Sequence, residues 1–297
     1  MIRSEGRTGR VGAAAVAALA SRLTERDRLV ALACYEHRVL TTEQLRRLHF
    51  GSSRRTRWRL ERLYQLRVLD RFRPPRERGQ GSAPFHWVLD EAGAHIVAEA
   101  LGAERSELRW RHQAAVAIAA SNTLTHQLEV NELFTRLAEE ASQAGGRLAD
   151  WWGERRCLAV LGGRAAPDGY GRLELPGREP VSLLLELDRA TERPAERLRQ
   201  KARRYARALP RSPLAQEALL IVVAAPTPAR RDSLARALAA SSAPIRVTVW
   251  TPERSALEAL ADVLPARPRA SGRPPAEKEI SDPDHPTDLA PPPAPHA

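Results

Sequence analysis

Two short, almost wholly apolar segments constrain the fold of this 297-residue chain most strongly: VSLLLEL at 181–187 and EALLIVVAA at 217–225. Apolar runs of this length are typical of strands buried on both faces, which need helices packed on either side. The segment between them, PAERLRQKARRYARAL, has amphipathic spacing, and Pro194 suits a first helical turn. This part of the chain is therefore expected to form an α/β layered structure.

The neighbouring sequence extends the pattern over residues 103–265. In chain order it predicts a helix over 112–144, strands over 155–161, 167–175 and 181–188, a helix over 194–209, a strand over 217–225, a helix over 228–240 and a strand over 245–250. The turn PGREP makes the second and third strands a hairpin. The order α-β-β-β-α-β-α-β predicts an α/β sandwich with a mixed sheet.

Residues 22–102 have a different pattern, of the α+β class. Helices are expected over 24–40, from Thr41 to Gly51 and from Ser52 onward, and Thr41 with Gln44 fits a capping box. Short strands at 68–72 and 85–89 flank a loop rich in Pro, Gly and Arg, and a short helix follows. Three helices followed by a two-stranded hairpin predict a winged helix-turn-helix domain.

Positive charge favours a polyanionic partner. The chain has 47 Lys+Arg against 36 Asp+Glu, a formal net charge of +11. Residues 51–73 contain eight arginines and only two acidic residues, Glu61 and Asp70. The expected contacts with double-stranded DNA are Arg54, Arg55, Arg57, Arg59 and Arg62 on the third helix and Arg76 and Arg78 in the wing loop. The alternatives are a solvated basic helix on an Arg-rich chain and a winged helix that binds protein.

The two ends of the chain are expected to lie outside both domains. Residues 1–21 are predicted to be a flexible leader, and the Pro-rich segment 266–297 is predicted to be a disordered tail. Only two cysteines are present, Cys34 and Cys157, each in an apolar stretch, so we expect reduced core residues. No apolar run is long enough to span a bilayer. These features favour a cytoplasmic protein without a membrane partner.

Carboxylates gather where the predicted sheet would bring them together. Asp168 begins the second strand, and Glu186 and Asp188 end the third, on one strand face. Such a cluster can hold Mg²⁺ or Mn²⁺ through Asp168 and Glu186, because these cations prefer oxygen ligands, and a bound metal can activate water. The alternative is a surface patch in which Asp188 pairs with Arg189 or Arg204.

The pattern Pro167-Asp168 followed by Glu186-Leu187-Asp188 resembles the PD-(D/E)xK nuclease superfamily. The resemblance implies a restriction-endonuclease-like core in which Asp168, Glu186, Asp188 and Lys201 are the candidate catalytic residues. The superfamily usually has Lys at the third position, where this chain has Asp188. Arg189, or Lys201 from the next helix, is a candidate substitute for that lysine.

Over residues 24–250 the chain also resembles the replication-relaxation family, through LTHQLEVNELF, WWGE, PDGYGRLEL, LELDRATE and RQKARRYARAL. The positions carried over from this resemblance are His126, Asn131, Glu154, Asp168, Glu186, Asp188, Thr191, Glu192, Lys201 and Tyr205. The resemblance implies a role near replication, relaxation or transfer of plasmids and other mobile elements.

Three functions follow as expectations. The first is a DNA-binding protein of mobile elements with a nuclease-like domain, working with other replication or mobilisation proteins and with a homodimer as one possible state. The second is an active metal-dependent endonuclease that nicks DNA. The third is a winged-helix transcriptional regulator whose second domain serves only assembly.

Overall fold

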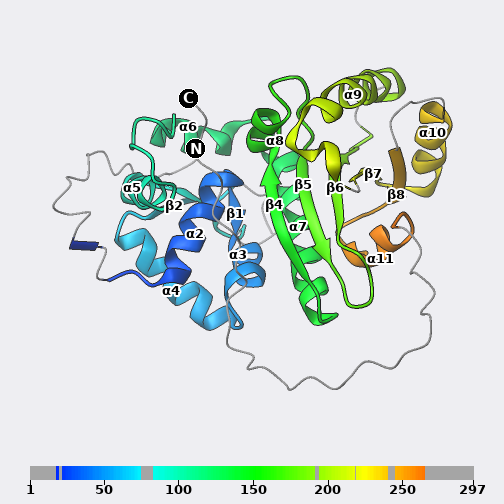
Figure 1. Ribbon diagram of the computed structural model, residues 1–297. Helices are drawn as coiled ribbons and strands as arrows, with labels where there is room; N and C mark the ends of the chain where they lie inside the picture. Colours follow the sequence, from blue (N-terminus) through cyan, green and yellow to red (C-terminus); the bar gives the residue numbers. More distant parts are fainter. Residues whose placement is uncertain are drawn as a thin grey trace.

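The computed structural model describes residues 18–19, 22–74, 83–190, 194–217, 219–239 and 245–264, and shows a mixed α+β protein with two sheets (Figure 1). Most of the predicted leader and all of the predicted tail lie outside the described residues. So do Arg76, Arg78, Thr191 and Glu192. In the described part of the chain, no helix is long and apolar enough to cross a membrane.

The N-terminal half is built from short helices and a small antiparallel sheet. Its elements are α2 (Glu25–Glu36), β1 (Leu40–Thr41), α3 (Thr42–His49), α4 (Ser53–Gln65), β2 (Leu69–Phe72), β3 (His86–Leu89) and α5 (Glu91–Ala100). The strand order is β1-β3-β2. The predicted capping box is confirmed, because Gln44 N–H donates to Thr41 Oγ1 at 3.2 Å and Thr41 N–H donates to Gln44 Oε1 at 3.0 Å.

The C-terminal half contains a five-stranded sheet. Its elements are α6 (His112–Ala117), η1 (Ile118–Ala120), α7 (Leu124–Gln143), β4 (Arg147–Gly153), α8 (Glu154–Val160), β5 (Gly169–Glu174), β6 (Val181–Leu187), α9 (Pro194–Ala208), η2 (Leu209–Arg211), η3 (Pro213–Gln216), β7 (Leu219–Ala225), α10 (Pro228–Leu238), β8 (Ile245–Val249) and α11 (Ala256–Ala261). The order is β4-β5-β6-β7-β8, antiparallel up to β6 and parallel from β6 to β8. The predicted mixed sheet and its hairpin are confirmed.

Three local predictions were wrong. Residues 155–161, predicted as a strand, lie almost entirely in helix α8, and the first strand is β4 just before it. The helix predicted over 112–144 is interrupted near Ser121, whose Oγ accepts the N–H of Thr123 at 3.1 Å. The helix predicted to reach residue 40 ends at Glu36, because the chain turns there and enters β1.

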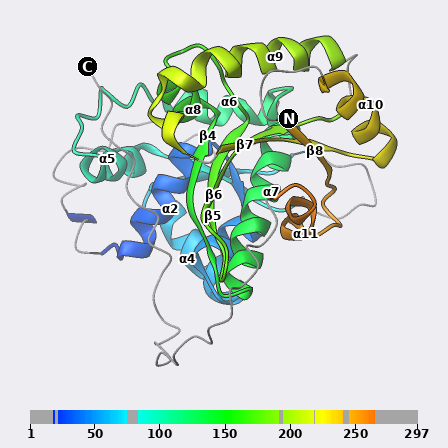
Figure 2. The same ribbon diagram turned by 45° about the vertical axis from the view of Figure 1, so that its right-hand side comes forward.

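Alternate side chains on the central strand β6 face different helices. Leu183 and Leu185 pack in the same core as α7, whereas Leu184 packs with Tyr205 of α9. Figure 2 shows the sheet nearly edge-on, with α7 and α11 together on one side. Helix α7 approaches β5 so closely that a Cβ at Gly171 would lie 2.8 Å from the ring of Phe134. A glycine is therefore required at this point of the sheet.

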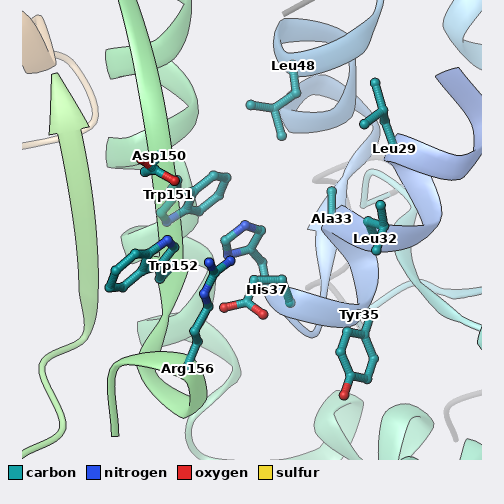
Figure 3. A pocket seen from close by; sticks show the side chains of 11 residues that line it. Leu29, Leu32, Ala33, Tyr35, His37, Leu48, Asp150, Trp151, Trp152 and Arg156 are labelled. Carbon is teal, nitrogen blue, oxygen red and sulfur yellow. The ribbon is translucent and has the colours of Figure 1, made fainter. Parts of the chain in front are cut away.

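The two halves share one hydrophobic core. His37, at the end of α2, stacks on Trp151 of β4 with ring centroids 3.4 Å apart. Arg47 of α3 pairs with Glu132 of α7 at 2.8 Å. A small cavity of about 50 Å³ lies at this junction. Figure 3 shows Trp151 on one side of it and Leu29 on the other. The two halves therefore meet through stacked rings, an ion pair and shared apolar packing.

Candidate functional site

Asp168 and Glu186 are neighbours at one end of the sheet. The backbone N–H of Asp168 donates to the carbonyl of Leu185 at 3.0 Å, and Gly169 is paired with Leu185 in the β5–β6 register. The Oδ2 atom of Asp168 accepts the N–H of Leu187 at 2.8 Å. The hairpin therefore brings the first two predicted carboxylates together, as expected from the sequence.

His126 of α7 forms an ion pair with Asp168, with 3.1 Å between Nε2 and Oδ1. Burial alone would raise the pKa of Asp168, but the hydrogen bond from His126 and the charge of Lys201 outweigh it, so this pKa is lowered. The hydrogen bond to Asp168 raises the pKa of His126. The pair therefore favours a charged imidazolium beside a charged carboxylate.

Glu186 is buried between two side chains of α9. Lys201 Nζ forms an ion pair with Oε2, and the hydroxyl of Tyr205 donates to Oε1. Burial and, next, the charge of Asp168 raise the pKa of Glu186 to about 7. Burial also raises the pKa of the Tyr205 hydroxyl, and the charge of Glu186 adds to this effect. Glu186 is therefore poised to change charge near neutral pH.

Lys201 is the cation that lies beside both carboxylates. Burial would lower its pKa, but the charges of Glu186 and Asp168 outweigh this and raise it. Arg189, the other predicted substitute for the missing lysine, instead pairs with Glu129 at 2.9 Å. Of the two candidates, the structure places only Lys201 against Glu186.

Asp188 has a partner that was not predicted. Its two carboxylate oxygens accept from Arg230 of α10, at 2.7 and 3.2 Å. The alternative, in which Asp188 pairs with Arg189 or Arg204, was therefore wrong in its partner. Arg230 is 42 residues away along the chain, so only the packing of α10 beside β7 reveals the contact. Asp188 still lines the same cavity as Glu186.

Two adjoining cavities, of about 340 and 370 Å³, share His126, Asp168 and Lys201 in their walls; we call the combined space the Asp168 cavity. Glu154, the first residue of α8, also lines it. Asn131 does not line it and is fully buried. The structure thus brings most of the predicted polar residues of this half to one space.

The donor set is compatible with a small divalent cation at two carboxylates. No group of three or more His, Cys, Asp or Glu residues suited to a metal occurs in the described part of the chain. Mg²⁺, however, commonly uses one or two carboxylates and completes its shell with water and substrate phosphate. Both oxygens of Asp168 and both of Glu186 are engaged within the protein, so a metal held by them would have to displace some of these contacts.

The surface of α4 differs in character. Arg54, Arg55 and Arg57 are exposed, and the side chains of Arg54 and Arg55 have no hydrogen-bond or ion-pair partner within the described residues. Trp58 lies among them with 67% of its surface exposed. We call Arg54, Arg55, Arg57 and Trp58 the α4 face.

Two other predicted DNA contacts on α4 are engaged within the protein. Arg59 Nε donates to Asp27 Oδ1 at 2.6 Å, and its guanidinium forms an ion pair with this buried carboxylate. Arg62 donates to Gln65 at 3.3 Å. Arg59 therefore ties α4 to α2 in this structure, and we do not include it in the α4 face.

Comparison with known protein families matches residues 33–219 to the replication-relaxation family. The match covers more than half of the chain, so the protein belongs to this family. Membership points to a role in the replication of plasmids or other mobile elements. Comparison with curated proteins and with solved structures gave no match.

Proposed function

We propose that the chain is a DNA-binding protein of plasmid or mobile-element replication, with the N-terminal half acting as a winged helix-turn-helix. The observation that carries the proposal is the α4 face: exposed arginines around one exposed tryptophan, on the last helix before a two-stranded hairpin. Arginine binds phosphates and guanine edges, and an exposed indole offers a surface to bases. The family's link to replication supports a nucleic-acid partner.

The test compares wild type with the variant Arg54→Ala/Arg55→Ala/Arg57→Ala in their affinity for a duplex oligonucleotide. Each lost base contact is expected to weaken binding by about 1–3 kcal/mol. A charge-matched control replaces three exposed arginines of the other half, Arg211, Arg236 and Arg246, with alanine. Equal affinities of wild type and the α4 variant in a mobility-shift assay would contradict the proposal.

The second candidate function is metal-dependent cleavage of a phosphodiester bond in the Asp168 cavity. The observation that favours it is the place of Lys201, which supplies beside Glu186 the cation that the sequence lacks at position 188. A divalent metal held by Asp168 and Glu186 would activate water and stabilise negative charge. In this proposal His126 orients Asp168, and Lys201 neutralises charge on the substrate phosphate.

Two measurements test this second candidate. Calorimetric titration with Mn²⁺ should show binding to wild type and none to Asp168→Ala/Glu186→Ala. Supercoiled plasmid incubated with Mg²⁺ or Mn²⁺ should be nicked, EDTA should stop the reaction, and Lys201→Met should lack it. Metal binding without nicking would leave a metal-binding site that does not cleave, and the absence of both would remove this candidate.

A further inference from the structure

Helix α2 is followed by a strained turn centred on Arg38. The N–H of Val39 donates to the carbonyl of His37 at 2.7 Å, and φ of Arg38 is +67°. A γ-turn with positive central φ is rare and strained for a residue that has a Cβ, and glycine adopts it without this cost. The chain nevertheless has an arginine here, with an exposed side chain between two buried neighbours.

The side chain of Asn131 in α7 is hydrogen-bonded to the backbone of this turn. Its Nδ2 donates to the carbonyl of His37 at 3.3 Å and to that of Val39 at 2.6 Å, so both sides of Arg38 are fixed. Its Oδ1 accepts from Gln127 at 3.0 Å, which orients the amide. Asn131 is fully buried, and these bonds use both ends of its side chain. Strain in a backbone persists where the surroundings determine it in this way.

The turn places Arg38 in the wall of the Asp168 cavity. Lys201 and Arg204 of α9 line the same wall. Within the described residues, the side chain of Arg38 makes no hydrogen bond or ion pair. Its planar guanidinium carries donors spaced for two oxygens of one phosphate, a geometry that lysine lacks.

We propose that Arg38 binds a backbone phosphate of nucleic acid in the Asp168 cavity, and that Asn131 is the residue that positions it. The inference rests on the proposed function, because it takes nucleic acid to be the partner. It makes the site composite: the carboxylates and Lys201 come from the C-terminal half, and one phosphate-binding cation comes from the N-terminal half. The tight turn, rather than a flexible side chain alone, sets the direction of that cation.

The variant Arg38→Gly separates this role from a structural one. Glycine relieves the strain of the positive φ, so the thermal midpoint should equal or exceed that of wild type. Affinity for a duplex oligonucleotide should fall about tenfold, since a charge-assisted contact is lost. The slope of log affinity against log salt should fall by about 1.

A matched control is available at Arg109. It has a φ of +49°, an exposed side chain with no partner among the described residues, and no place in the walls of the Asp168 cavity. Arg109→Gly therefore removes the same charge and relieves the same kind of strain. It should leave affinity within about twofold of wild type.

Asn131→Ala tests the positioning role when it is made in wild type and in Arg38→Gly. It should weaken DNA binding in wild type and cause no further loss in Arg38→Gly, because the two residues act through one contact. If wild type binds DNA and Arg38→Gly binds equally well, or if both glycine variants lose affinity equally, the inference is overturned while the proposed function stands. If wild type binds no DNA, both are overturned.

Discussion

The α4 face and the Asp168 cavity are both rich in charge, but they hold it in opposite ways. On the α4 face, arginines stand in solvent around an exposed tryptophan. In the cavity, each of the central groups Asp168, Glu186 and Lys201 is at least partly buried and has an oppositely charged partner. Exposed cations cost little to keep unpaired, whereas a buried charge without a partner costs several kcal/mol.

Because of this difference, substitutions in the two regions should affect different properties: the stability of the fold in one and the affinity for DNA in the other. Replacing one of the three central groups of the cavity should change the free energy of unfolding, because its partner is left buried. Replacing an arginine of the α4 face should change the affinity for DNA and leave unfolding almost unaltered. The two regions can therefore be compared with variants of similar chemistry measured by the same two assays.

The largest expected effect belongs to Lys201→Ala. Lys201 lowers the pKa of Glu186, so its removal raises this pKa further. At about pH 8 the variant must keep a buried carboxylate without its cation or take up a proton, and the free energy of unfolding should fall by up to about 3–5 kcal/mol. At lower pH the loss should shrink, because Glu186, whose pKa is raised to about 7, then takes up a proton. Denaturant unfolding at about pH 8 and about pH 5 measures both values.

Arg203→Ala is the matched control on the same helix. Arg203 is exposed, so its replacement should change the free energy of unfolding by less than about 0.5 kcal/mol. Equal losses in both variants, or a loss in Lys201→Ala that does not depend on pH, would show that the buried pair is not what distinguishes the cavity.

A smaller effect is expected at His112, the half-buried first residue of α6, which is paired with Asp70 of β2. The hydrogen bond to Asp70, at 2.9 Å, is the largest cause that raises the pKa of His112. A raised folded-state pKa stabilises the fold below the ordinary value of 6.5, and this contribution is lost as pH rises through the raised pKa. His112→Gln should therefore cost about 1 kcal/mol in acid and less in alkali.

Thermal or denaturant unfolding of wild type and His112→Gln, in acid and in alkali, measures how this cost changes with pH. A cost that is constant with pH would assign the effect to packing rather than to charge. The burial of a charged pair would then not explain the stability difference between such sites and the α4 face.

The smallest expected effect is on the stability of Arg54→Ala/Arg55→Ala/Arg57→Ala. Because these side chains are exposed, its free energy of unfolding should differ from wild type by no more than about 0.5 kcal/mol. Denaturant unfolding measures it. A loss of several kcal/mol would mean that the α4 face is part of the fold and would remove the contrast with the cavity.

The sequence predicted the parts of the fold whose signals are local. The hairpin of β5 and β6, helix α9, and strands β7 and β8 follow from apolar runs and turn residues. Strand β4 was missed because a register shift between Leu148 and Asp150 breaks its alternation. The apolar run at 155–161 was assigned to a strand, since periodicity alone does not separate a short strand from a short helix.

The candidate site was predictable only in part, for a similar reason. The antiparallel hairpin makes Asp168 and Glu186 neighbours, and this could be read from the strand order. The partner of Asp188 is Arg230, which depends on how α10 packs on the sheet. The role of Arg38 depends on a backbone angle and on two hydrogen bonds from Asn131, for which the sequence has no signal.

The most direct measurement is the salt dependence of duplex affinity for wild type and for Arg54→Ala/Arg55→Ala/Arg57→Ala. Each phosphate contact contributes about 0.9 to the slope of log affinity against log salt, so the variant should lose up to about 2.7. Its affinity should also be lower at every salt concentration. Identical slopes and affinities would show that the α4 face does not contact DNA, and DNA binding through this half of the protein would be contradicted.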